Sequence, residues 1–186
     1  MKEIILASAS PRRAALLKQI GLSFRSVRSP YQESPVKVEK MVGENALAKA
    51  EKVFLLYPHS LILGADTAVI CEEIIMGKPR DTSDAVKMLN MLNGKEHRVI
   101  TAVALMEKGR ARVEQEETRV FFREIEEEEI YSYAASGEPW DKAGGYGIQE
   151  KGAVFVKRIE GCYFNVVGLP IALLVKMLKE YNWPIW

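Results

Sequence analysis

The chain has 186 residues, of which 48% are hydrophobic and 27% are charged, and its formal net charge is +1. This composition is typical of a globular protein with a hydrophobic core, and the length suits a single domain. The near-neutral charge gives no global field that favours nucleic acid or an anionic membrane surface, so any anion site has to be local.

Neither the N-terminal residues nor the cysteines indicate export or a metal centre. Only a short apolar stretch follows the first residues, which argues against a signal peptide. The longest apolar run is broken by Gly168 and Pro170 and is too short to span a bilayer. Cys71 and Cys162 lie far apart and lack ligand spacing, so we expect free, reduced thiols in a cytoplasmic protein.

A strand-to-helix junction near the N-terminus is the first feature that points to a ligand. The apolar stretch 4–6 predicts a short strand, and the helix after it is expected to run from residue 11 to about residue 20. Ser10 is a favoured N-cap, and Pro11 suits the first helical position. The free amides and positive dipole end of such a helix attract anions, above all phosphate.

Arg12 and Arg13 lie in the first turn of this helix, where a cation opposes the helix dipole. An anionic ligand would explain their presence, since guanidinium groups bind phosphate oxygens well. The alternative is a capped surface helix whose two arginines are only solvated.

Hydrophobic periodicity predicts alternating helices and strands along the rest of the chain. Helices are expected at about 38–56, from 81 or 82 to 92, from 126 and from 170, and strands at 61–70, 74–76, 97–105, 111–122 and 153–159. Segment 24–38 is interpreted as a loop or edge strand, and the glycine-rich segment 136–149 as a long, functional loop. Parallel-type buried strands, antiparallel hairpins and interleaved helices together predict a mixed α/β fold.

Two charged residues interrupt or border predicted buried faces. Asp66 lies inside the apolar run 61–70, and a bare buried carboxylate is costly, so it must be paired, hydrogen-bonded, metal-bound or at an opening. The alternative is a turn cap at a strand end. Gly64 and Ala65 favour an opening, because small residues let a ligand approach the backbone. Lys49 borders a buried helix face, and its spacing favours an ammonium that extends to solvent over one that reaches into a cleft.

Two other polar features are interpreted as structural. His97 has no partner residue nearby in the sequence, so we expect it to have a structural role. The acidic run 126–129 is interpreted as a solvated helix face, because four consecutive side chains cannot point toward one metal ion.

Four cations and two carboxylates stand out as candidates for one site: Arg12, Arg13, Lys49, Lys78, Glu33 and Asp66. A nucleoside triphosphate carries several negative charges and travels with a divalent cation, so its binding needs this mixture of bases and carboxylates. A P-loop enzyme is excluded, because the sequence contains no G-x-x-x-x-G-K-[ST] motif.

Seven stretches carry a resemblance to a known family: SASPRR at 8–13, ENALAKA at 44–50, GADTAVI at 64–70, GKP at 77–79, HRVITAV at 97–103, KAGGYGIQ at 142–149 and NVVGLP at 165–170. Together, and in this order, they resemble the Maf (septum formation inhibitor) family of nucleoside triphosphate pyrophosphatases. The resemblance implies an ITP-pyrophosphatase-like (Maf/Ham1-like) fold, with an elongated mixed sheet, surrounding helices and a cleft between two lobes, in one domain over 1–186.

The resemblance also implies an activity and its residues. Family members of the dTTP/UTP branch hydrolyse these nucleotides to the monophosphate and pyrophosphate, and modified pyrimidine triphosphates are expected substrates as well. The proton-accepting aspartate of the family falls on Asp66, and the residues tied to substrate choice fall on Arg12, Thr67 and Gln149. Further substrate-binding positions fall on Ser8, Arg13, Lys49 and Lys78.

A divalent metal, Mg²⁺ with Mn²⁺ as the alternative, is expected to bridge the triphosphate and the carboxylates of Asp66 and Glu33. Asp66 would deprotonate the water that attacks the α-phosphorus, and Gln149 would pair with the edge of uracil or thymine through one donor and one acceptor. A homodimer and a link to cell-division arrest are expected from the family alone. The alternative function is a non-catalytic septation regulator that binds nucleotide or nucleic acid, although the near-neutral charge argues against nucleic acid.

Overall fold

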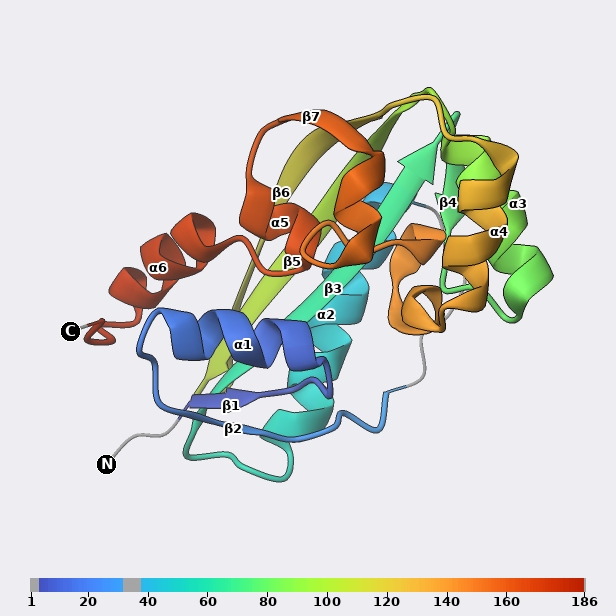
Figure 1. Ribbon diagram of the computed structural model, residues 1–186. Helices are drawn as coiled ribbons and strands as arrows, with labels where there is room; N and C mark the ends of the chain where they lie inside the picture. The colour runs from blue at the N-terminus through green and yellow to red at the C-terminus, as the bar shows by residue number, and fades with distance from the viewer. Residues whose placement is uncertain (1–3, 32–37, 186) are drawn as a thin grey trace. The chain divides into compact units, whose positions relative to one another are not determined.

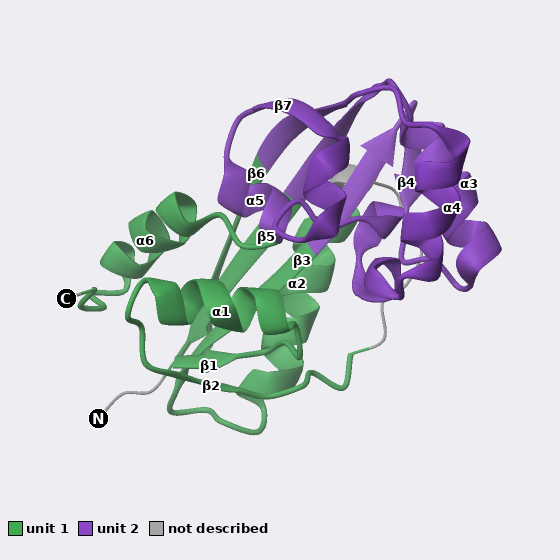
Figure 2. Cartoon of the chain, viewed as in Figure 1, with its two compact units in different colours: residues 1–66, 101–116, 168–186 green, residues 67–100, 117–167 purple. Residues whose placement is uncertain are grey.

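The computed structural model describes residues 4–31 and 38–185, and the chain divides into two compact units. Three long strands contribute residues to both: β3 (Leu61–Cys71), β5 (Glu96–Glu107) and β6 (Arg110–Phe122). Unit 1 comprises residues 1–66, 101–116 and 168–186, and unit 2 comprises residues 67–100 and 117–167 (Figure 2).

Seven strands of the described chain form one mixed sheet. Besides the three long strands, it contains β1 (Ile4–Leu6), β2 (Phe24–Ser26), β4 (Ile74–Met76) and β7 (Val156–Glu160), in the order β2-β1-β3-β5-β6-β7 with β4 paired to β3 (Figure 1). Strand β1 runs parallel to β2 and β3, whereas β4 and β7 run antiparallel to β3 and β6. This sheet and its helices confirm the predicted α/β class.

Unit 1 begins with the predicted strand-to-helix junction. Strand β1 is buried along its whole length between two parallel neighbours, and α1 (Pro11–Gln19) follows it. Ser10 has an extended backbone, and its hydroxyl accepts a hydrogen bond from the Arg13 N–H at 3.5 Å. The predicted N-cap and helix start are therefore confirmed.

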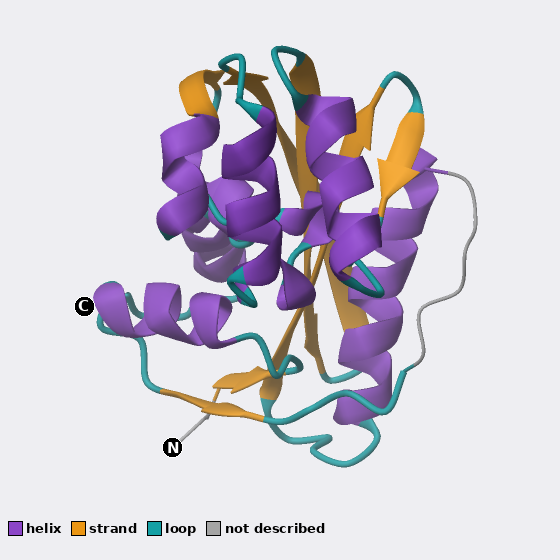
Figure 3. Ribbon diagram, turned by 45° about the vertical axis from the view of Figure 1, so that its right-hand side comes forward, coloured by secondary structure: helices purple, strands orange, loops and turns teal. Residues whose placement is uncertain are grey.

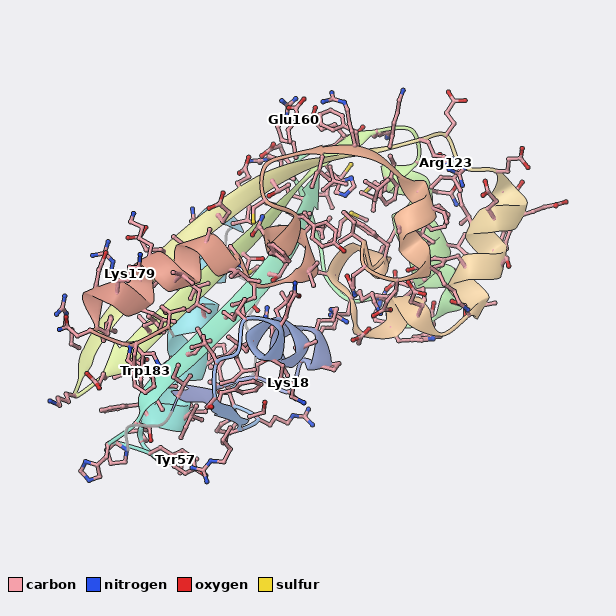
Figure 4. All side chains as sticks on the ribbon, turned by 60° about the vertical axis from the view of Figure 1, so that its left-hand side comes forward. Lys18, Tyr57, Arg123, Glu160, Lys179 and Trp183 are labelled. Atoms are coloured by element: carbon pink, nitrogen blue, oxygen red, sulfur yellow. The ribbon has the colours of Figure 1, made fainter. Side chains whose placement is uncertain are left out.

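Two further helices, α2 (Val38–Phe54) and α6 (Ile171–Glu180), complete unit 1. Helix α6 buries aliphatic side chains on one face, as its periodicity predicts. The exposed Lys18 on α1 and Lys179 on α6 lie on the outside of this unit (Figure 4). Each lies in the last turn of its helix, where a cation interacts favourably with the dipole.

Unit 2 is rich in short helices, as the secondary-structure view shows (Figure 3). They are α3 (Thr82–Leu92), α4 (Glu127–Ala135), α5 (Tyr163–Val167) and the 3-10 helices η1 (Glu138–Asp141), η2 (Ala143–Gly145) and η3 (Lys151–Phe155). Helix α3 begins where predicted, because the Asp81 carboxylate accepts from the Asp84 N–H at 2.7 Å. In α4, Glu126 and Glu129 form a capping box, which gives the acidic run a structural role.

Three details differ from the sequence expectations. Residues 153–155 belong to η3, so the last strand begins at Val156 and not at Ala153. Segment 136–149, predicted as a loop, contains η1 and η2. Helix α5 was not predicted, because five residues are too few to show helical periodicity.

Neither cysteine forms a disulfide, as expected, and burial raises the pKa of the Cys71 thiol. Within residues 4–31 and 38–185, no helix has both the length and the hydropathy that crossing a bilayer requires.

Aromatic rings form much of the core of unit 2, and His97 lies among them. The His97 ring meets Phe122 and Tyr146 edge-on, with centroids 4.9 and 5.4 Å away, and its Nε2 is 2.7 Å from the Tyr146 hydroxyl. His97 is 2% exposed, and its Nδ1 has no hydrogen-bond partner among the described residues. These surroundings agree with the structural interpretation of this residue.

The burial of His97 predicts an acid-sensitive fold. Burial lowers the His97 pKa from 6.5 to about 4, so between these values the unfolded chain binds a proton that the folded chain does not. We expect this residue to cost the fold about 2 kcal/mol of unfolding free energy between pH 7 and pH 5. Urea denaturation of the wild type and of His97→Gln at both pH values measures this loss. Equal pH dependence in the two proteins would contradict the prediction.

Candidate active site

The residues selected from the sequence fall into both units, and each unit is described by itself. Unit 1 contains five of them: Ser8, Arg12, Arg13, Lys49 and Asp66. Unit 2 contains three: Thr67, Lys78 and Gln149. Glu33, the second expected metal ligand, lies outside the described residues.

Arg13 is buried at the N-terminal junction and is held by protein acceptors. Its Nε donates to the Gly168 carbonyl at 2.8 Å, and its Nη1 donates to the Ser8 hydroxyl at 3.3 Å. Ser8 Oγ also accepts from the Ser10 N–H at 3.1 Å. The guanidinium thus joins the junction to the segment before α6. These hydrogen bonds give Arg13 a structural role that the sequence did not reveal. Arg12, in the same turn, is half-buried.

Asp66 lies in the middle of β3, and a donor reaches each of its carboxylate oxygens. Lys49 Nζ is 2.6 Å from Oδ1, and Asn45 Nδ2 donates to Oδ2 at 3.0 Å. Asp66 is 7% exposed as a residue, and the Lys49 side chain is 12% exposed. The cost of burying this carboxylate is therefore offset by a cation and an amide.

This geometry decides two alternatives that the sequence left open. Asp66 is paired inside a strand and does not cap a turn at a strand end. The preference for a solvent-directed Lys49 was wrong, because its ammonium turns toward Asp66. The spacing located Lys49 correctly at the border of a buried helix face, but it could not show which group lies opposite.

The close approach of α2 to β3 brings these groups together. A Cβ atom built on Gly64 would lie 2.2 Å from the Ala46 carbonyl oxygen and 3.0 Å from the Ala50 Cβ. Glycine is therefore required at this position for the backbones to approach so closely. Asn45 and Lys49, one turn apart on α2, share the face that this approach brings to Asp66.

Sequence reasoning missed Asn45 and Tyr31. Asn45 is 3% exposed, and its Oδ1 accepts from the Tyr31 hydroxyl at 3.0 Å while its Nδ2 donates to Asp66. Asparagine is unfavourable in a helix interior because its side chain competes for backbone hydrogen bonds. Its place on the buried face of α2 was the signal that could have identified it.

The carboxylate ligands available in the described site fit a divalent metal that arrives bound to its substrate. Among residues 4–31 and 38–185, no group of three or more His, Cys, Asp or Glu side chains could hold an ion. Mg²⁺, however, is commonly held by one or two carboxylates, and waters and phosphate oxygens complete its coordination. Asp66 is a carboxylate of this kind.

In unit 2, Gln149 is held by its neighbour. Gln149 Nε2 donates to Glu150 Oε1 at 3.0 Å, and Glu150 Oε2 is 3.0 Å from the buried Lys142 ammonium. Lys142 Nζ also donates to the Glu138 carbonyl at 2.7 Å, so this group anchors the segment that contains Gln149. Lys78 is exposed, and Thr67, the next residue after Asp66 on β3, is half-buried.

Comparison with known proteins now assigns the chain to a family. The family model described as "Maf-like protein" matches residues 3–181. The chain belongs to the Maf family. It is 47% identical over 186 residues to the dTTP/UTP pyrophosphatase of Geobacillus sp. (strain WCH70), a match that covers 98% of this chain and 100% of the relative. It is 49% identical over 180 residues to the dTTP/UTP pyrophosphatase of Syntrophomonas wolfei, with 94% and 95% covered.

A solved structure resembles the Maf fold described above. The Staphylococcus aureus Ham1 protein matches with a TM-score of 0.56 at 16% sequence identity, and the match covers 97% of this chain and 100% of that one. The expected Maf/Ham1-like fold is therefore confirmed.

The contact between α2 and β3 yields a testable pair of variants. Gly64→Ala places a methyl group against the Ala46 carbonyl, so we expect α2 to move away from β3, with loss of stability and activity. In Gly43→Ala, the new methyl meets Val113 at an ordinary 3.5 Å, and alanine is favoured over glycine in a helix. Melting temperature and turnover of both variants test this, and a Gly64→Ala protein that equals Gly43→Ala in both would contradict it.

Proposed function

We propose that this chain hydrolyses dTTP and UTP to the nucleoside monophosphate and pyrophosphate. The observation that carries the proposal is the buried carboxylate of Asp66, held between an ammonium and an amide in unit 1. The proposal also draws on the full-length similarity to relatives named dTTP/UTP pyrophosphatases.

Asp66 acts as the general base in this reaction. It accepts a proton from water, and the water oxygen forms a bond to the α-phosphorus. The bond between the α-phosphorus and the bridging oxygen breaks, and pyrophosphate leaves with the electron pair of that bond. Lys49 Nζ lies 2.6 Å from Asp66 Oδ1, and Lys49 stabilises the charge that develops on the phosphate oxygens.

The start of α1 supplies a second anion-binding element in unit 1. The helix dipole makes this end of α1 positive, and the Ser10 N-cap holds the Arg13 N–H. Ser8, Arg12 and Arg13 lie at this end. We assign them to the triphosphate, with Lys78 of unit 2 as a further phosphate-binding cation.

The divalent metal, Mg²⁺ or Mn²⁺, would be held by Asp66 and Glu33 together with the triphosphate. When bound, it supplies positive charge that neutralises the phosphate oxygens.

We assign recognition of the substrate's nucleobase to Gln149, together with Arg12 and Thr67. Uracil and thymine present an N3–H donor beside a carbonyl acceptor, and an amide matches this pair with one acceptor and one donor. Cytosine presents the reversed pattern and would need the amide turned over.

Several expectations stay predictions. They are the single domain over 1–186 with one cleft between two lobes, the homodimer, the cytoplasmic location, the turnover of modified pyrimidine triphosphates and the link to cell-division arrest.

The first test replaces the proposed general base, Asp66. Asp66→Asn keeps the size of the side chain but cannot accept the proton, so we expect turnover of UTP to fall by at least about 10²–10⁴-fold with nucleotide binding retained. Pyrophosphate release and calorimetric titration measure the two properties. Asp84→Asn, which alters a half-buried carboxylate on α3 that forms an ion pair with Arg80, is the matched control and should keep its activity. Near-normal turnover by Asp66→Asn would show that Asp66 is not the base.

The second test is a substrate panel, assayed for pyrophosphate release with and without Mg²⁺. We expect UTP and dTTP to be hydrolysed faster than CTP, ATP and GTP, and activity to require the metal. Faster hydrolysis of ATP or GTP than of UTP and dTTP would contradict the assignment of Gln149. Nucleotide binding without pyrophosphate release would favour the non-catalytic alternative.

A further inference from the structure

The hydrogen bonds around Asp66 continue beyond the residues assigned above, and all of them lie within unit 1. Asn45 donates to Asp66 Oδ2, and Tyr31 donates to Asn45 Oδ1, each at 3.0 Å. We propose that Asn45 is a positioning residue for Asp66, and that Tyr31 fixes Asn45 in the orientation this role requires. The inference rests on the proposed function, because it concerns the same general base.

The chemistry of the three groups fixes the direction of each hydrogen bond. An ionised carboxylate only accepts, so the side of Asn45 that faces Asp66 must be its NH₂ group. The amide oxygen of Asn45 then faces Tyr31, whose hydroxyl can donate to it. If the Tyr31 hydroxyl is removed, the amide loses the partner that holds its oxygen away from the carboxylate.

The two donors to Asp66 differ in charge and in freedom of movement. Lys49 is a cation on a flexible side chain, and a phosphate group would compete with Asp66 for it. Asn45 is neutral, shorter and 3% exposed, so a phosphate competes poorly for its amide. When Lys49 turns to the substrate, Oδ1 becomes available to water, while Asn45 still holds Oδ2 and fixes the plane of the carboxylate.

The loop before residue 32 is attached to the same turn of α2. Ser29 Oγ donates to the Lys49 carbonyl at 3.1 Å, and the Tyr31 N–H donates to Ser29 Oγ at 3.3 Å. These bonds place Tyr31 beside Asn45 independently of the contact between their side chains. Residues 29 and 31 therefore support the two α2 residues that hold Asp66.

The test is a double-mutant cycle in pyrophosphate release from UTP. Because Asn45 acts through Asp66, we expect Asn45→Ala to lower kcat by about 10- to 100-fold, with a much smaller change in KM. In the Asp66→Asn background, Asn45→Ala should lower kcat no further. A residue that only supports the fold would lower kcat in both backgrounds and would lower the melting temperature in proportion.

Two further variants keep the test decisive. Tyr31→Phe removes a single hydroxyl and should lower kcat several-fold without unfolding the protein, which provides the measurement if Asn45→Ala folds poorly. Asn90→Ala removes an exposed helical asparagine whose Nδ2 donates to the Val86 carbonyl in α3, and it should leave kcat unchanged. Wild-type kcat in Asn45→Ala or in Tyr31→Phe, or an additive double mutant, would overturn the inference. A wild type that releases no pyrophosphate would instead overturn the proposed function, and the inference with it.

Discussion

The pairing of one buried carboxylate with Lys49 and Asn45 is the interaction on which the rest of the site depends. An ionised side chain at 7% exposure in the middle of a strand is tolerable only if donors replace the water it has lost. Removing one partner of such a pair typically costs about 3–5 kcal/mol, whereas hydrophobic replacement of the whole pair is often neutral or stabilising. Stability alone therefore explains this pair poorly, and a buried carboxylate paired in this way points to chemistry.

The fold provides this pairing through close packing in unit 1. Gly64 lets α2 approach β3 to a distance that no side chain would allow, and one turn of α2 then presents both donors. The same turn holds the segment that contains Ser29 and Tyr31. Because the carboxylate, both donors and their supports come from packed elements, the carboxylate is held in place before substrate arrives, and positioning of this kind is a main source of rate in phosphoryl transfer.

Local sequence signals predicted the elements of this structure well. The start of α1 and the α3 cap depend on neighbouring residues, so Ser10 and Asp81 could be recognised directly. The contacts that define the site are long-range. Lys49 meets a residue 17 positions away and Arg13 one 155 positions away, and no periodicity reports such partners. This is why the direction of Lys49 was wrong, why the protein partners of Arg13 were not foreseen, and why Asn45 and Tyr31 were missed.

A crystal structure with a UTP analogue whose α,β-bridge cannot be hydrolysed would show whether Asp66 activates the water that attacks the α-phosphorus. We expect a water within hydrogen-bond distance of Asp66 and about 3–3.5 Å from the α-phosphorus, with Lys49 on a phosphate oxygen. An α-phosphorus bound out of reach of any water held by Asp66 would contradict it.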